Sequence, residues 1–334
     1  MKKMIVMALI SLVLSILVCV WLFSQVRLSE FKNSLQDFNA IEITLFVLIN
    51  IVLQLLRVWR FESLLDKNKT ISFNQLFSIV NISMMAVFLL PLRLGEFVRP
   101  YLLKKKLSMT FGEGLASVAT ERIIDGLVVL FGFFIVTQIS PDISQRIRHV
   151  GFVAFLFFAS VAIVLLLMLW KQPFFERVVA FFLGRYFKSL YTRVIELSRA
   201  IIQGLKPILK LHQLFRYTWL TCVIWGITAI ATQLLCHAIH VSISFTEAYV
   251  ILTLTVVSVM LPAGPMTLGP FHAAVVMGLQ LFKIAKAPAL ACAFLLHGLP
   301  ALITLLFGFY SLLKSHLSLS YLIQDSQKEA HIKT

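Results

Sequence analysis

The chain consists of long apolar segments separated by short polar loops, a pattern typical of a helical membrane protein. A helix needs about 20 apolar residues to cross the hydrocarbon core of a bilayer. Segments near this length predict spans at residues 4–23, 43–59, 111–138, 151–170, 214–237 and 288–313. We predict a single all-α transmembrane domain over residues 1–334, with about seven spans plus two re-entrant helical hairpins in a pseudo-inverted arrangement. Its parts are a first half at 1–170, a basic cytoplasmic linker at 171–211, a second half at 212–313 and a cytoplasmic tail at 314–334.

The first predicted hairpin interrupts the apolar pattern at residues 73–106. Residues 73–92 approach spanning length, but a simple crossing would place Arg93, Arg99 and three lysines outside, against the positive-inside bias. Pro91 and Gly95 break the helical backbone in the same place. Non-helical backbone at membrane depth must be buried in protein or reached by water. We therefore expect a hairpin that enters and leaves on the cytoplasmic side.

The second predicted hairpin covers residues 248–282 and opens to the outside. Its two arms, 248–261 and 271–282, are both too short to span a bilayer comfortably. The break between them contains Pro262, Gly264, Pro265, Gly269 and Pro270. The sequence before each break is similar, Phe-Leu-Leu-Pro in the first half and Val-Met-Leu-Pro in the second. Paired interrupted segments in two halves of a chain point to a transporter-type site between them.

Composition and charge favour a membrane location and argue against a nucleic-acid partner. Of the 334 residues, 59% are hydrophobic and 13% are charged, and the formal net charge is +15. The basic residues lie in short loops beside apolar spans, which fits the positive-inside rule better than a nucleic-acid-binding surface. We expect a multi-pass protein of the cytoplasmic (inner) membrane, with both termini in the cytoplasm.

The most basic stretch is 171–210, where eight basic and two acidic residues leave a net charge of +6. Phenylalanines and valines alternate with these charges roughly as they do in a helix lying in a membrane interface. We predict that this cytoplasmic linker contacts an anionic lipid surface. A dedicated regulatory site in the same stretch is the less favoured reading.

An ionisable cluster lies between the apolar segments of the first half. It comprises Arg93, Glu96, Arg99, Glu113, Glu121, Arg122 and Asp125. Such side chains at membrane depth are costly and persist mainly where they face a bundle interior or an aqueous cavity. In a helix over 111–138, Glu121 and Asp125 fall on one stripe with Glu113, whereas Arg122 lies about 100° away and can reach another element.

Two interpretations of this cluster stay open, and they are compatible with each other. One is an intramembrane ion-pair network, for example Glu121 with Arg93 or Arg99, that locks the hairpin to the following helix. The other is a substrate site, in which an arginine not needed for pairing binds phosphate with its bidentate fork. In the second half the candidate is His272, beside the Gly269–Pro270 break, whereas His297 is interpreted as structural.

Motifs for catalysis are not found in the sequence. It contains no P-loop, no G-x-S-x-G and no H-E-x-x-H. The four cysteines lie in apolar segments without the spacing of a metal site or an extracellular disulfide framework. We therefore expect no cofactor, no metal and no catalytic residue, and the sequence leaves the oligomeric state open.

The motif Pro91-x-Arg93-x-Gly95-Glu96-x-x-Arg99, followed by Glu121-Arg122-x-x-Asp125, resembles the signature of a known family. This is the lysylphosphatidylglycerol synthase transmembrane-region family of flippase-like proteins, which includes the UPF0104 proteins. The resemblance covers nearly the whole chain and implies two re-entrant hairpins. In bifunctional members the domain flips an aminoacylated phospholipid made by a fused soluble synthase domain.

The chain departs from that family in two respects. No soluble domain follows residue 313, so synthase activity is not implied. The family's second motif usually has Gly-Gly and an acidic residue, whereas this chain has Leu268-Gly269 and His272, so the headgroup preference is open.

The leading hypothesis is a flippase that moves a phospholipid or polyprenyl-phosphate-type headgroup across the membrane. Arg93, Arg99 and Arg122 would bind phosphate, while Glu96, Glu121 and Asp125 would hold the arginines or bind an amino group or a proton. The alternatives are an integral-membrane lipid-modifying enzyme and a non-transporting subunit of an envelope lipid or glycan synthesis complex.

Overall fold

The computed structural model describes residues 2–65, 71–140, 143–184, 187–205, 211–260 and 264–315, and within them it contains helices and no strands. Five of the described helices are long and apolar enough to cross a membrane. They are α3 (Ala40–Glu62), α6 (Phe111–Ile139), α7 (Gln145–Trp170), α10 (Leu211–Ala238) and α13 (Lys286–Lys314). The protein is therefore a polytopic helical membrane protein, as predicted, whereas the total of about seven spans stays a prediction.

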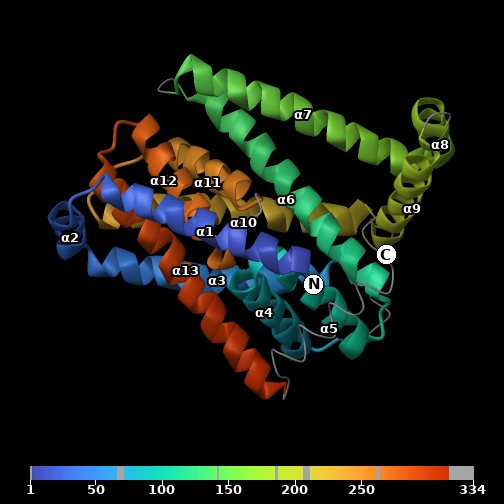
Figure 1. Cartoon of the computed structure of the whole chain (residues 1–334), viewed down its shortest axis with the longest axis horizontal. Helices are drawn as coiled ribbons and strands as arrows, with labels where there is room; N and C mark the ends of the chain where they lie inside the picture. Colours follow the sequence, from blue (N-terminus) through green and yellow to red (C-terminus); the bar gives the residue numbers. More distant parts are fainter. Residues whose placement is uncertain are drawn as a thin grey trace.

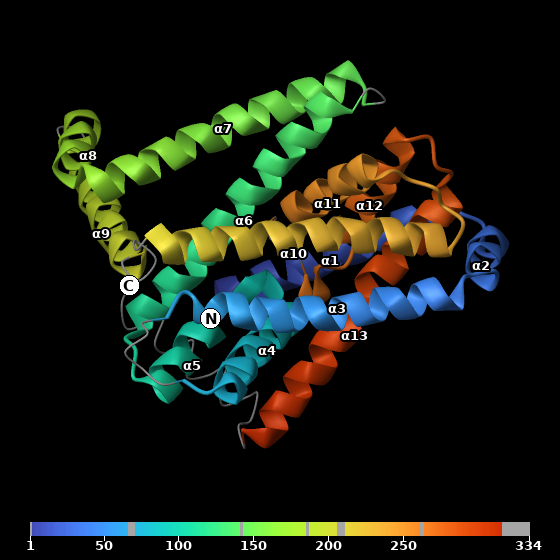
Figure 2. The same ribbon diagram turned by 180° about the vertical axis from the view of Figure 1, so that it is seen from behind.

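The centre of the molecule is a bundle of these helices. α3 packs along α10, and Figure 2 shows the two running side by side through most of the molecule. α6 packs against α10 and α11, and it turns into α7, which lies on the outer side of the bundle (Figure 1). α13 packs against α4 and α12, and it continues through Pro300 as one helix. The predicted apolar segments thus form helices that pack together in one bundle.

The first predicted hairpin is a pair of short helices joined by a tight turn. α4 (Phe73–Leu89) starts with a capping box between Ser72 and Gln75 and ends just before Pro91. A residue that precedes proline disfavours the α conformation, and Leu90 is accordingly extended. A 3-10 turn, η1 (Pro91–Phe97), then leads into α5 (Val98–Leu107). Gly95 is required because a Cβ there would lie 2.1 Å from the Val87 backbone nitrogen of α4.

The second hairpin consists of α11 (Phe245–Met260), the turn η4 (Pro265–Thr267) and α12 (Pro270–Leu281). Its helices have 16 and 12 residues and pack against each other, so both are shorter than a span, as predicted. Gly269 has φ +89°, and a Cβ there would meet the Ser15 carbonyl oxygen at 2.8 Å. The Gly264 N–H donates to Ser15 Oγ at 3.1 Å. Helix α1 (Lys2–Ser24) thus braces this turn, whereas Pro262 lies outside the described residues.

The turns of the two hairpins approach each other in the interior. η4 packs against both α4 and η1, and α1 also packs against η1. In Figure 2 the α4–α5 hairpin and the α11–α12 hairpin lie in opposite halves of the molecule along its long axis. The pseudo-inverted relation between the two hairpins stays a prediction. Entry of each hairpin from one membrane side stays a prediction.

The basic linker forms helices that project from the bundle. α8 (Gln172–Val179) and the π-helical turn η2 (Ala180–Gly184) lead to α9 (Lys188–Leu205), which packs on α6. Phe174, Phe181 and Phe182 are exposed on the first two elements. Helix α2 (Leu28–Gln36) lies at the opposite end of the long axis from α8 and α9 (Figure 1).

Candidate functional site

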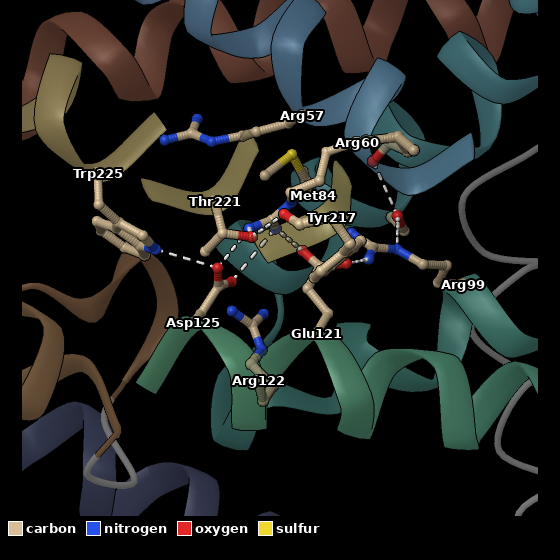
Figure 3. Close-up of polar contacts among 12 residues, drawn as sticks. Arg57, Arg60, Met84, Arg99, Glu121, Arg122, Asp125, Tyr217, Thr221 and Trp225 are labelled. Carbon is tan, nitrogen blue, oxygen red and sulfur yellow. Dashed lines mark hydrogen bonds and ion pairs between the residues drawn. The ribbon is translucent and has the colours of Figure 1, made fainter. Parts of the chain in front are cut away.

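The centre of the site is a buried pair of carboxylates on α6. Glu121 and Asp125 lie one turn apart and are 8% and 7% exposed. Arg60 of α3 bridges them, because one of its terminal nitrogens donates to Glu121 Oε1 at 2.9 Å while the guanidinium also pairs closely with Asp125. The same guanidinium donates to Thr221 Oγ1 of α10 at 3.3 Å. One arginine therefore joins three helices (Figure 3).

The first hairpin is tied to this centre through Arg99 of α5. Its guanidinium donates to Glu121 Oε2 at 2.5 Å and to Ser83 Oγ of α4 at 3.0 Å. The predicted ion pair between Glu121 and Arg99 is therefore confirmed. Because both oxygens of Glu121 are occupied, one by each arginine, this carboxylate links the hairpin to the bundle.

Aromatic side chains complete the shell of the network. The Arg60 guanidinium lies over the Tyr217 ring at 5.1 Å, and that of Arg99 lies over the Phe61 ring at 5.0 Å. Trp225 Nε1 donates to Asp125 Oδ1 at 3.0 Å. Two positive and two negative side chains thus balance in a buried environment. Removing one member of such a buried set typically costs 3–5 kcal/mol, because its partner is left charged and unpaired.

The remaining predicted residues of the first half fall into three groups. Arg122 reaches sideways, as predicted, and pairs with Glu96 of η1 at 3.4 Å. Glu113 is exposed and caps the start of α6 through a capping box with Thr110, so it does not share the interior stripe with Glu121. The backbones of Pro91 and Arg93 belong to η1, and their side chains, like that of Pro265, lie outside the description.

Arg60 and Arg57 are functional candidates that sequence reasoning missed. They lie at the end of a predicted span, where basic residues ordinarily mark the cytoplasmic boundary. The structure instead directs Arg60 inward, where it is 3% exposed. The available signal was their spacing: two arginines one turn apart, following Asn50 and Gln54 on the same helix, make one face of α3 polar.

A cavity of about 320 Å³ adjoins the network; we call it the central cavity. Its polar wall contains Arg57 and Asn50 of α3, Arg122 and Asp125 of α6, and Trp225 of α10. Most of the remaining wall is apolar and comes from α11, α12 and α13. The cavity therefore has a charged side next to the ion-pair network and a largely apolar side opposite it.

His272 does not join the carboxylate network. Its ring lies between α12 and α13, with its centroid 4.9 Å from that of His297 and 4.5 Å from that of Phe294. It is 1% exposed, and neither ring nitrogen has a hydrogen-bond partner in the described part of the chain. Its neighbour Phe271 lines the central cavity. The described residues also contain no group of three or more potential metal ligands.

Comparison with known proteins gives one match. The family described as lysylphosphatidylglycerol synthase TM region matches residues 8–308, which is nearly the whole chain. No curated protein and no solved structure matches.

Proposed function

This chain belongs to the lysylphosphatidylglycerol synthase TM-region family, and on that premise we propose that it moves a lipid with a phosphate-containing headgroup across the cytoplasmic membrane. The headgroup passes through the central cavity while the hydrocarbon chains stay in the bilayer. Arginines of the cavity bind the phosphate. The buried carboxylates pair with Arg60 and Arg99 and so hold together the helices around the cavity. No catalytic step is part of this proposal.

The observation that carries the proposal is the depth of the charges. Asp125 lies fourteen residues from each end of α6, which at 1.5 Å per residue is about 21 Å from both. In a helix that spans the membrane this position is near the midplane. Charged residues at that depth usually mark a substrate or ion pathway rather than a surface feature. A polar cavity wall at the midplane is what a headgroup needs on its way across.

The broken hairpins support the same proposal. Their turns, η1 and η4, approach each other close to the network, and Glu96 of η1 pairs with Arg122. Interrupted helices in two halves of a transporter typically form the site and provide the moving parts. Rocking of one hairpin against the other would open the central cavity first to one membrane side and then to the other.

The exposed surface of α8 and η2 fits a lipid partner as well. Exposed phenylalanines there accompany the basic linker, a combination that binds an anionic interface. We propose that this surface lies on the cytoplasmic leaflet, with both termini on the same side.

The test is a flipping assay with purified protein in liposomes. Phospholipids carrying a headgroup-proximal fluorophore are placed in both leaflets, and a membrane-impermeant reductant is added outside. Protein-free liposomes should lose about half of the fluorescence, whereas liposomes with active protein should lose nearly all of it. Mass spectrometry of the recovered lipids runs in parallel.

The outcomes separate the alternatives. Faster loss of protected fluorescence with unchanged lipids supports transport. A chemically altered lipid would favour the lipid-modifying enzyme. If no phospholipid or polyprenyl phosphate moves above the protein-free rate, transport is wrong and the non-transporting subunit takes its place.

A further inference from the structure

The arginines of the site differ in what neutralises them. Arg60 and Arg99 match Glu121 and Asp125 charge for charge, and Arg122 faces Glu96. Arg57 has no carboxylate within ion-pair distance among the residues that the structure describes; its hydrogen-bond partner is the neutral Gln54 Oε1 at 3.1 Å. Among the described residues, one positive charge of the site therefore stays uncompensated.

Arg57 is nevertheless held in a defined position. Gln54 Nε2 donates to Asn81 Oδ1 of α4 at 2.7 Å and to Met84 Sδ at 3.3 Å, which directs the Gln54 carbonyl toward Arg57. Because a guanidinium has five N–H donors and this bond uses one, most of its donors remain for a ligand. Figure 3 shows the Arg57 side chain extending away from Glu121 toward the side where Trp225 lies.

The surplus charge lies in the wall of the central cavity. The charged residues that line it, in the described part of the chain, are Arg57, Arg122 and Asp125. Asp125 is already bound by Arg60, so the lining presents positive charge to a ligand. A half-buried cation without a counter-charge is unfavourable, and a bound anion removes that cost. A phosphodiester, which carries one negative charge, matches one uncompensated arginine.

Three threonines that line the cavity give it a preference for a ligand with hydroxyl groups. Thr228 and Thr232 of α10 and Thr255 of α11 line it. Each hydroxyl donates to a carbonyl of its own helix, at 2.7, 2.9 and 2.7 Å respectively. Their hydrogens are therefore used, and their lone pairs remain as acceptors for donors on a ligand. A neutral hydroxyl group satisfies them, whereas an ammonium group would be repelled by the positive lining.

We propose that Arg57 is the phosphate ligand of the central cavity and that it acts with Thr228, Thr232 and Thr255 to select a singly charged phosphodiester lipid with a hydroxyl-bearing headgroup. The inference rests on the proposed function and specifies the class of lipid that the protein would transport. Cationic aminoacyl lipids and zwitterionic lipids are disfavoured by the same wall. At about 320 Å³ the cavity is at the small end of ligand sites, so it holds the headgroup and leaves the chains outside.

The test measures binding separately from transport. Native mass spectrometry of the full chain in detergent is titrated with short-chain phosphatidylglycerol, phosphatidylethanolamine and phosphatidylcholine. Wild-type protein should prefer phosphatidylglycerol. Arg57→Gln should weaken that binding on the order of tenfold or more, since a charge-assisted hydrogen bond is lost. Arg57→Lys should retain part of it, and Arg216→Gln, at an exposed ion pair with Glu62, should leave it unchanged.

The threonine preference has its own variant. Thr228→Val keeps the shape of the wall and removes an acceptor, so it should weaken binding of phosphatidylglycerol severalfold while leaving that of a glycerol-free phosphatidylmethanol unchanged. Equal losses for both lipids would contradict selection by the hydroxyl group.

Two results overturn the assignment of Arg57. One is wild-type affinity of Arg57→Gln for phosphatidylglycerol while the wild-type protein flips lipid, which leaves transport standing and removes this site. The other is a preference of the wild-type protein for a zwitterionic lipid. Conversely, binding that depends on Arg57 without any flipping keeps the site and refutes transport. A melting temperature of Arg57→Gln equal to or above that of wild type would show that its binding defect is not a folding defect.

Discussion

Arg57 and Arg60 lie one turn apart on α3, yet Arg60 is bound by two carboxylates and Arg57 by a single neutral amide. The two side chains therefore have different roles. Arg60 is part of a balanced buried network that holds α3, α6 and α10 together. Arg57 carries a charge that the described protein does not neutralise, in the wall of the central cavity. Stability and ligand binding should consequently respond to different arginines.

Substitution of Arg60 should destabilise the fold. Arg60→Met leaves Glu121 and Asp125 with one cation fewer in a buried environment, and we expect a loss of about 3–5 kcal/mol. Arg216→Met is the matched control, because its pair with Glu62 at 3.4 Å is exposed and such pairs contribute about 0–1 kcal/mol. Unfolding of the purified variants in detergent measures both. Equal stability of the two variants would contradict the network as a structural element.

The turn of the first hairpin should not tolerate a side chain. Gly95→Ala places a Cβ against α4 backbone, and neither partner can move without separating the turn from the helix. We expect loss of folded protein on size-exclusion chromatography. Gly226→Ala is the control: it lies within α10 with open space around its Cβ, where alanine is favoured by roughly 1 kcal/mol. A monodisperse Gly95→Ala protein of wild-type stability would refute the close packing.

His272 should be replaceable by phenylalanine. Its ring nitrogens are buried without partners in the described structure, and aromatic rings surround it. His272→Phe replaces the imidazole, whose polar atoms are unsatisfied, with an apolar ring of similar shape. We therefore expect the free energy of unfolding to rise by about 1 kcal/mol. His149→Phe at an exposed position should change it by less than about 0.5 kcal/mol. A marked drop in stability for His272→Phe would contradict this expectation and would show that the imidazole nitrogens have a structural role.

The ends of the hairpins can be assigned to membrane sides by labelling. We expect Lys105→Cys on α5 and Arg193→Cys on α9 to be protected from an impermeant thiol reagent in intact cells, because both lie in basic segments that we predict to be cytoplasmic. Asp37→Cys, beside α2 at the other end, should react. The four native cysteines are replaced first. Reaction at position 105 from outside would exclude a cytoplasmic first hairpin.

Transport of an anionic lipid should respond to the membrane potential. Each elementary charge gains about 2.3 kcal/mol per 100 mV, so an inside-negative potential of 100 mV favours outward movement of a monoanion by about fiftyfold at equilibrium. A potassium diffusion potential in liposomes tests this, and Glu121→Gln should alter the pH dependence of the rate. A rate that ignores both potential and pH would indicate a passive, scramblase-like path.

The sequence by itself determined where the helices break and that two carboxylates of α6, Glu121 and Asp125, face inward. Proline and glycine restrict or free the backbone locally. The turns at Pro91–Gly95 and at Gly269–Pro270 can therefore be predicted from the local sequence alone. Helical periodicity likewise places Glu121 and Asp125 on one face. It fails for Glu113, because the start of α6 is exposed and its free N–H groups recruit that carboxylate.

Only the tertiary structure decided which cations meet these carboxylates. Arg60 is 61 and 65 residues away from them along the chain, and their contact depends on how α3 is rotated against α6 and α10. An arginine side chain near a helix end can extend to the membrane interface or turn inward. The local sequence does not distinguish between these two orientations. The difference between Arg57 and Arg60 has the same origin. The two residues are about 60° apart around the axis of α3, so that Arg60 contacts the carboxylates of α6 whereas Arg57 lines the central cavity.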